Sequence, residues 1–386
     1  MAHSIMFIAG DVSGDEHASH VVSQILQKNK NTRVFGIGGP HMAAAGFEQL
    51  MPFGPFNRMG LAEVLSHLPF FLGAKAKLIK VLTDVKPDVL VCVDYPGFNI
   101  PIMKEAHKLG IPVVWYIVPQ VWAWKKKRAA ILGAYASYIG VVFPFEVPYF
   151  NQFAAPVEFV GHPLAEALDK RNVAFTAKSK QQSLEGVSQI QCAIVPGSRV
   201  QEIKQILGPM MLACMLLKRK YPMFQVIVSK CKGLPKALFE TACNDFVKAF
   251  PQSIAITEEP LIDVLRKSDV AMVTSGTATL QTALCGVPMV ICYKTSALTY
   301  TLLKRMITLP YIGLPNIVAS EKIVPELIQH KANASEIAHV ISQYIGTPSS
   351  YARTVQKLGT LREKLGNKCP SEEISLAIER LCDKRR

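Results

Sequence analysis

The sequence predicts an α/β protein with two doubly wound parallel sheets. Short apolar strands alternate with amphipathic helices along most of the 386 residues, and this length favours two domains. Residues 169–189 lose apolar periodicity and gain Lys, Ser and Gln, as an interdomain linker does. We therefore expect a first domain over residues 1–168, a second over 190–345, and C-terminal helices over 346–386 that could return across the first domain.

The strands of the first sheet end in acidic or small residues. Asp11 and Asp15 follow the first strand, and Asp94 follows Val89–Val93, which is fully apolar as a central parallel strand is. Ligands of open parallel sheets bind at the carboxyl ends of the strands, so these carboxylates should lie at the ligand-binding edge. No P-loop and no G-x-G-x-x-G sequence is present, so nicotinamide binding is poorly supported. The expected strands are Ile5–Ala9, Val34–Ile37, Val89–Val93, Val113–Ile117, Tyr138–Phe143 and Val157–Val160.

Two turns in the second domain are suited to hold an anion. Residues 195–199 (VPGSR) follow one strand, and residues 274–277 (TSGT) follow another. Each turn starts a helix with free backbone N–H groups; Gly197 lets a ligand approach the backbone, and Arg199 offers a planar set of donors for phosphate. An ordinary capped helix is the alternative for each turn alone, but two such turns on one sheet could converge. The expected strands are Ala193–Val195, Gln225–Val228, Ser253–Ile256, Val270–Val273 and Met289–Cys292.

The composition indicates a globular protein with an acidic partner. The formal net charge is +14 and the pI is near 9.3. Nucleic acid is not expected as the partner, because no nucleic-acid motif is recognised and the cations are spread; an anionic membrane surface or a phosphorylated lipid fits better. The 9 cysteines are scattered without a C-x-x-C pair, so we expect reduced thiols, no zinc site and a cytoplasmic protein. No apolar segment reaches the roughly 18 to 20 residues of a membrane span.

An apolar segment is one candidate lipid-contact surface. Phe70, Phe71 and Leu72 precede Lys75 and two further lysines at helical spacing, which would flank an exposed apolar lip with positive charge. A buried elbow is the alternative, since hydrophobic stretches more often belong to a core.

A tryptophan segment is the other candidate surface. Trp122 and Trp124 stand beside the cationic cluster that includes Lys125 and Arg128. This segment could form a wall for a sugar or an acyl chain with cations near a phosphate. A solvated helix face over packed aromatic side chains is the alternative.

A series of short strings together resembles the lipid A disaccharide synthase family. The strings occur in the expected order from residue 9 to residue 320, and the series rather than any one string carries the resemblance. They are AGDVSGD, GIGGPHMAAAG, MGLAEVL, DYPGFN, VPQVWAWKKKR, FPFE, FVGHPL, VPGSRVQEI, SGTATL and LPNIVAS.

The resemblance implies a GT-B fold, in which two Rossmann-like domains face a central cleft, and an inverting glycosyltransferase. The implied reaction takes a diacylglucosamine unit from UDP and attaches it to the 6-hydroxyl of diacylglucosamine 1-phosphate, giving the β-1,6-linked lipid A disaccharide precursor. No metal and no cofactor are expected, because GT-B enzymes generally work without a bound metal and no D-x-D motif appears at the donor site. The acylated substrates imply reversible docking on the cytoplasmic face of the inner membrane.

This reaction needs a general base and a site that stabilises the departing UDP. The base is expected among Asp94, Asp15 and Asp11. Asp94 is placed first, because desolvation at the end of the most apolar strand could raise its pKa; alternatively, Asp94 only caps its turn. His162 is a further alternative for the base. The expected donor-site residues are Gly197, Ser198, Arg199, Glu202, Ser275, Gly276, Thr277, Gln281 and Asn316.

Three positions depart from the family pattern. Asp11 stands where the family more often has Glu, Gly97 where some members carry Asp, and Gln281 where Glu is expected. An amide can still hydrogen-bond a ribose hydroxyl, so Gln281 stays in the expected donor site. Two other classes of protein remain open. One is another UDP-GlcNAc-type GT-B enzyme, an epimerase or a glycosyltransferase acting on a polyprenyl-linked acceptor, and the other is a non-catalytic nucleotide- or lipid-binding protein. A homodimer and a monomer also both remain open.

Overall fold

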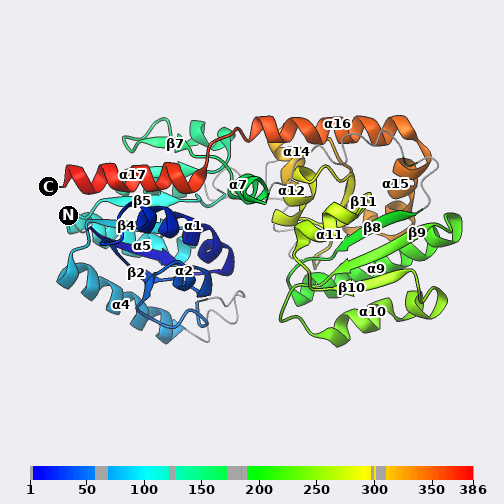
Figure 1. The fold of residues 1–386 in the computed structure, drawn as a ribbon, viewed down its shortest axis with the longest axis horizontal. Helices are drawn as coiled ribbons and strands as arrows, with labels where there is room; N and C mark the ends of the chain where they lie inside the picture. Colours follow the sequence, from blue (N-terminus) through cyan, green and yellow to red (C-terminus); the bar gives the residue numbers. More distant parts are fainter. Residues whose placement is uncertain are drawn as a thin grey trace. The chain divides into compact units, whose positions relative to one another are not determined.

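The computed structural model describes residues 3–56, 68–120, 127–171, 184, 189–296, 300 and 310–385. The chain divides into two compact units, one of residues 1–166 with 367–386 and the other of residues 167–366. Each unit is built on one parallel sheet (Figure 1). The chain therefore leaves the first unit after Glu166 and returns to it at Asn367.

The first unit contains a seven-stranded sheet in the order β3-β2-β1-β4-β5-β6-β7, and every neighbouring pair is parallel. The strands expected from the sequence are all present, to within two residues at their ends. The two-residue strand β3 was not predicted, because so short a segment shows no periodicity. The strands are β1 (Ser4–Ala9), β2 (Arg33–Ile37), β3 (Glu48–Gln49), β4 (Val89–Val93), β5 (Val113–Tyr116), β6 (Tyr138–Val141) and β7 (Val157–Phe159).

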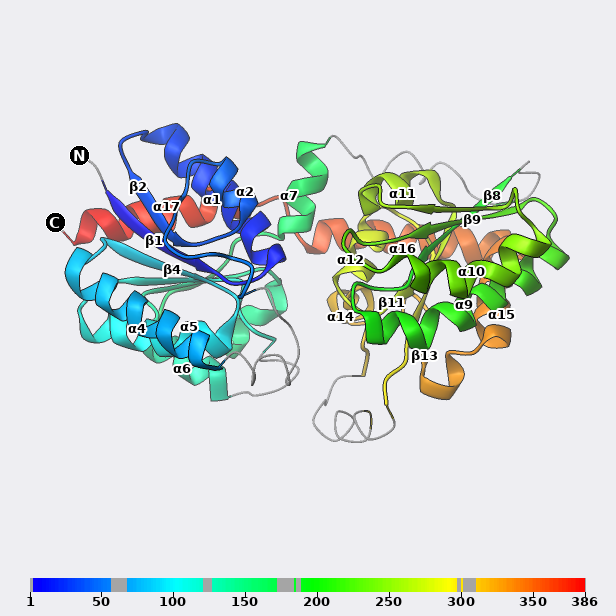
Figure 2. The ribbon, with the colours of Figure 1, turned by 90° about the horizontal axis from the view of Figure 1, so that it is seen from below.

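Helices cover both faces of this sheet. Figure 2 shows α1 and α17 on one face and α4, α5 and α6 on the other. The inward face of α1, formed by Ala18, Val21, Val22 and Ile25, is buried. The helices are α1 (Val12–Lys28), α2 (Pro40–Ala44), α4 (Leu68–Val85), α5 (Pro96–Lys108), α6 (Lys127–Tyr135) and α17 (Pro370–Lys384), with the 3-10 turn η1 (Pro144–Tyr149) and, where the chain crosses to the second unit, α7 (Pro163–Lys170).

The second unit contains a six-stranded parallel sheet in the order β10-β9-β8-β11-β12-β13. The strands expected from the sequence are again present, whereas the three-residue strand β13 was not predicted. The strands are β8 (Ile190–Val195), β9 (Phe224–Ser229), β10 (Ile254–Thr257), β11 (Val270–Thr274), β12 (Met289–Tyr293) and β13 (Glu326–Ile328).

One face of the second sheet packs against α9, α10 and α15 in a continuous apolar core. Helices α11, α12, α14 and α16 contact one another in the same unit, so α16 belongs to this unit while α17 packs on α1 in the first. The helices are α9 (Val200–Lys220), α10 (Lys236–Ala249), α11 (Leu261–Lys267), α12 (Thr277–Leu284), α14 (Leu314–Ala319), α15 (Ala334–Gly346) and α16 (Pro348–Lys364), with the 3-10 turn η2 (Gln329–Lys331).

Helix α9 is long and apolar enough to cross a membrane by length and composition alone. Its buried residues, which include Ile203, Ile206 and Leu207, belong to the core of the second unit. Its last turn carries Lys218, Arg219 and Lys220. We therefore assign α9 to that core.

Each sheet has one point where the strand order changes direction. In the first unit this point lies between β1 and β4, and in the second it lies between β8 and β11. In doubly wound sheets, the carboxyl ends of the two strands at such a point diverge into helices on opposite faces and leave a crevice for ligands. The acidic turns after β1 and β4 and the anion-suited turns after β8 and β11 lie at these two points.

Candidate active site

The strand order brings Asp11 and Asp94 to neighbouring strand ends. Strands β1 and β4 pair in parallel with Ala9 opposite Val93, so the residues that follow them leave the sheet side by side. Gly10 allows this approach, because a Cβ at this position would lie 2.5 Å from the ring of Tyr95. Asp11 caps α1, with its Oδ1 accepting a hydrogen bond from Gly14 N at 2.6 Å.

Asp94 and Tyr95 form a strained turn. Both residues are left-handed, with φ of 41° and 49°, in a region that non-glycine residues seldom occupy. The turn is held by Asp94 N, which donates to Tyr116 O at 3.0 Å, and by Asn99 Nδ2, which donates to Asp94 O at 2.9 Å. Asn99 lies in the first turn of α5, which begins at Pro96. Such strain is concentrated at functional sites.

The surroundings of Asp94 suit it to accept a proton near neutral pH. Burial raises the pKa of its carboxyl to about 7, and the negative charge of Asp11 acts in the same direction. The Tyr95 backbone N–H and the Arg128 guanidinium act in the opposite direction. Arg128, expected from the sequence to contact the acceptor or the membrane, therefore lies where its charge acts on Asp94. A general base works best when its pKa is close to the operating pH.

Asp15 is a structural residue in this geometry. It is fully buried, and its carboxylate accepts hydrogen bonds from Gly39 N at 2.7 Å, His41 N at 3.0 Å and Met42 N at 3.0 Å. These three donors lie at the start of α2, where backbone N–H groups have no partner within the helix. Asp15 thus ties α2 to α1, which favours an anchoring role over the catalytic role expected from the sequence.

His162 also fits a structural role. It is buried, its Nδ1 accepts a hydrogen bond from Leu164 N at 3.1 Å, and burial lowers its pKa to about 3. Its imidazole is therefore neutral at physiological pH, with one nitrogen already engaged by the backbone.

The turn after β8 places the guanidinium of Arg199 near the backbone of Gly197, which carries no side chain. Gly197 has φ of 104°, a conformation that strains any side-chain-bearing residue, and Ser198 beside it is exposed. Arg199 is 64% exposed and donates from Nη1 to Glu202 Oε1 at 2.9 Å. A Cβ at Gly197 would lie 3.1 Å from Glu202 Oε2, so Glu202 lies against the turn and orients the guanidinium next to it.

The turn after β11 lies on the neighbouring strand. Gly276 and Thr277 are exposed at the start of α12, and Gln281 is half-buried one turn further along this helix. Ser275 is already engaged, because its hydroxyl donates to Ile312 O at 3.0 Å and its N–H donates to Cys292 O at 3.1 Å. Ser275 thus holds the turn in place, while Gly276 and Thr277 present the start of the helix.

Asn316 organises the chain instead of facing a ligand. It is fully buried; its Nδ2 donates to Val324 O at 2.9 Å and to Glu326 Oε1 at 2.8 Å. Its Oδ1 accepts from Ile323 N at 2.8 Å and Val324 N at 3.0 Å. The amide makes four hydrogen bonds in this arrangement, so the geometry favours a structural role for Asn316 over the donor contact expected from the sequence.

Two residues that were not among the expected site residues lie at the carboxyl-end edge of the second sheet. Thr274, the last residue of β11, is 4% exposed, and its Oγ1 has no hydrogen-bond partner among the described residues. Tyr293 ends β12, and its pKa is raised by burial and by the charge of Glu202 and lowered by that of Arg199. Each of these two residues is the last residue of an apolar strand, and a polar residue at this position is the sequence signal that could have identified them.

The structure corrects the expectation of an exposed apolar lip. Phe70 and Phe71 begin α4 and pack against the core, with the ring centroids of Phe56 and Phe70 5.0 Å apart and those of Phe71 and Phe98 6.0 Å apart. Leu72 is 59% exposed, while Lys75 is half-buried. The expected contacts through Trp122, Trp124 and Lys125 lie outside the described residues.

The two parallel-sheet units, each with its turns at a switch point, give the chain a GT-B fold. Among solved structures, the UDP-GlcNAc 2-epimerase from Neisseria meningitidis has a TM-score of 0.61 at 14% identity, covering 97% of this chain and 99% of that one. MurG from Acinetobacter baumannii has a TM-score of 0.60 at 14% identity, covering 98% of this chain and 100% of that one. At these identities the likeness shows the fold alone.

Sequence comparison shows the family. Residues 5–378 match the family model described as lipid-A-disaccharide synthetase. The lipid-A-disaccharide synthase of Geobacter metallireducens is 38% identical over 385 residues, covering 99% of this chain and 98% of the relative, and that of Neisseria gonorrhoeae is 33% identical over 353 residues, covering 91% and 90%. The chain belongs to the lipid-A-disaccharide synthase family and is a glycosyltransferase, which confirms the resemblance inferred from the sequence strings.

Proposed function

We propose that this enzyme condenses UDP-2,3-diacylglucosamine with 2,3-diacylglucosamine 1-phosphate to give the β-1,6-linked lipid A disaccharide 1-phosphate and UDP. The observation that carries the proposal is the family match over residues 5–378. Binding of a nucleotide sugar is further supported by solved structures of the same fold that are named as bound to UDP-GlcNAc and to UDP. The first unit takes the acceptor and the second unit takes the donor in this proposal.

In the proposed mechanism, Asp94 accepts the proton of the acceptor 6-hydroxyl. The hydroxyl oxygen forms a bond to the anomeric carbon of the donor, while the bond from that carbon to the UDP oxygen breaks with inversion. The support for Asp94 is its strained position at the switch point and a pKa of about 7, which leaves it partly ionised at physiological pH. Asp11 modulates Asp94 through its charge, and Asp15 anchors the start of α2.

Arg199 and the turns at Gly197 and Gly276 hold the diphosphate of UDP in this mechanism. Negative charge develops on the diphosphate as the bond breaks, and backbone N–H groups and a guanidinium stabilise that charge without reorganisation. Glu202 keeps Arg199 in place before the donor binds. Since these donors do electrostatically what a metal ion does in other enzymes, turnover is expected to be unchanged in EDTA, and complete loss of activity in EDTA would contradict this part of the mechanism.

Mass spectrometry of the products tests the reaction. The full chain, incubated with both acylated substrates, should yield one disaccharide 1-phosphate per UDP released. UDP-GlcNAc without acyl chains serves as the matched control. Hydrolysis or epimerisation of that control, with no disaccharide from the acylated pair, would assign the chain to another activity of the GT-B fold. Binding of UDP without any turnover would indicate a non-catalytic protein.

We also propose that the enzyme docks reversibly on the cytoplasmic face of the inner membrane, because both proposed substrates carry long acyl chains. The exposed part of the α4 surface supports this proposal. Leu72 is available to enter the interface, and Lys77 and Lys80 are exposed on the same helix, where cations contribute about 1 kcal/mol each near anionic headgroups. Lys80 is paired with Asp84 at 2.7 Å, which reduces its contribution.

A further inference from the structure

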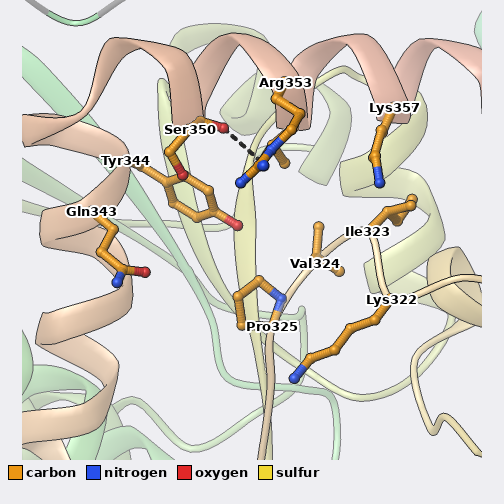
Figure 3. Close-up of a pocket in the computed structure, with 10 residues that line it drawn as sticks. Lys322, Ile323, Val324, Pro325, Gln343, Tyr344, Ser350, Arg353 and Lys357 are labelled. Carbon is orange, nitrogen blue, oxygen red and sulfur yellow. Dashed lines mark hydrogen bonds between the residues drawn. The ribbon is translucent and has the colours of Figure 1, made fainter.

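A basic hollow lies in the second unit, away from the turns at Gly197 and Gly276. It has a volume of about 220 Å³, is open to the surface on one side, and is lined by α15, α16 and the segment that leads into β13 (Figure 3). Tyr344 in its wall donates a hydrogen bond to Met289 O at 3.2 Å, and Met289 is the first residue of β12. The hollow therefore lies at the amino ends of the strands, at the opposite edge of the sheet from the candidate donor site.

Three cations line the hollow, and no acidic residue does so among its ten described lining residues. Arg353 and Lys357 lie four residues apart on one face of α16, and Lys322 lies in the segment before β13, where its side chain extends past Pro325 (Figure 3). Lys357 also pairs with Glu321 just outside the lining. Because Lys357 is paired, Arg353 and Lys322 supply most of the positive charge that an anion in the hollow would meet.

The rest of the lining adds to the positive potential. Ser350 lies in the first turn of α16, so the positive end of the helix dipole adds to the charge of the side chains. The hydroxyl of Thr354 donates to Ser350 O at 2.9 Å, and that of Tyr344 is engaged with Met289, so these groups shape the hollow. The guanidinium of Arg353 is the main donor toward an occupant, and Lys322 adds positive charge.

We propose that this hollow is a second anion site, which binds a phosphate group. Its volume is below the roughly 300 to 1,000 Å³ of pockets that enclose a whole small-molecule ligand, and it corresponds to about seven water molecules. A phosphate group with part of its hydration shell fits this space, while the rest of the ligand remains outside. Arg353 matches two phosphate oxygens with its planar donors, and Lys322 and Lys357 act as point charges.

Binding of inorganic phosphate to the full chain, measured by isothermal titration calorimetry, tests the proposal. A saturating concentration of UDP occupies the donor turn, and an Arg199→Ala background removes anion binding there by an independent route, so phosphate binding that persists reports the second site. The double variant Arg353→Gln, Lys322→Gln should weaken the Kd for phosphate about tenfold or more, as expected from the loss of charged hydrogen bonds. Arg219→Gln, which removes an exposed cation on α9, is the matched control and should leave the Kd unchanged.

Absence of saturable phosphate binding, or equal affinity in the wild type and the double variant, would overturn the proposal. Equal weakening by Arg219→Gln would also do so, because it would reduce the effect to overall charge. Because Arg353 and Lys322 are exposed, both variants should keep the thermal transition of the wild type. Vesicles containing phosphatidic acid, compared with phosphatidylcholine vesicles, separate the two sources of the phosphate group: sedimentation that the double variant loses assigns a lipid headgroup, and binding of free phosphate without such sedimentation assigns a soluble ligand.

Discussion

The pKa of about 7 at Asp94 predicts the pH dependence of the reaction. Below that pH the carboxyl is protonated and cannot accept the proton of the acceptor hydroxyl, so the acid limb of kcat/KM should have its midpoint near pH 7. Asp94→Asn keeps the size of the side chain but removes the proton acceptor. We expect this variant to lower kcat/KM about 10²- to 10⁴-fold, the usual contribution of a general base.

The charged neighbours of Asp94 allow the midpoint to be shifted in either direction. Asp11→Asn keeps a side-chain oxygen to accept the hydrogen bond from Gly14 N but removes the negative charge, so the midpoint should move to lower pH. Arg128→Gln removes a positive charge and should move it to higher pH. The assay is kcat/KM for the donor from pH 5 to pH 9 at saturating acceptor, measured for the wild type, Asp11→Asn and Arg128→Gln.

The pH dependence of the free energy of unfolding gives an independent measure of the pKa of Asp94. The difference between the ordinary value of 3.8 and about 7 corresponds to about 4 kcal/mol, at about 1.36 kcal/mol per pH unit. Since the pKa is higher in the folded state, the folded protein binds more protons between these values, and this group makes stability fall as the pH rises from about 4 to about 7. Asp94→Asn should therefore be more stable than the wild type at pH 8, by up to about 4 kcal/mol in urea unfolding, and should gain little near pH 4.

Near-normal turnover in a folded Asp94→Asn variant would refute the assignment of the base and would leave Asp11 as the next candidate. If Asp11→Asn and Arg128→Gln both left the midpoint where it is in the wild type, the charges of these two residues would not set the pKa of Asp94.

Three further predictions concern the donor turn, the membrane surface and the anchor of α2. Arg199→Ala should weaken donor binding or slow turnover by about 1.5 to 3 kcal/mol, and unchanged donor kinetics would exclude its role. Leu72→Ser should reduce sedimentation with anionic liposomes without lowering the melting temperature. The control variant Leu212→Ser, at a residue that is 56% exposed on α9, should change neither the sedimentation nor the melting temperature. Equal effects of the two variants on sedimentation would exclude α4 as the docking surface. Asp15→Ala should destabilise the fold by about 3 kcal/mol, because it leaves three buried N–H groups without their acceptor; unfolding at the denaturant concentration of the wild type would contradict the anchoring role.

The sequence by itself determined the two sheets and the turns at which their ligands should bind. Strand β4 has the bounds predicted from its apolar run, and the glycine of the turn after β8 has the positive φ for which glycine is suited. These features depend on residues close together in the chain, so local periodicity and turn chemistry suffice to predict them. The family could also be predicted, since short strings keep their order along the chain.

Only the tertiary structure decided which of the expected residues are available for chemistry. Asp15 is engaged by backbone groups more than 20 residues away, and Phe71 packs on Phe98 from another helix, so neither outcome can be inferred from the neighbouring sequence. Asp94 acquires its raised pKa from burial and from Asp11, which follows the adjacent strand β1. The hydrogen bonds and the desolvation of a side chain depend on groups that folding brings together from distant parts of the chain. The sequence therefore predicts where a site lies, but not which of its side chains remain free to react.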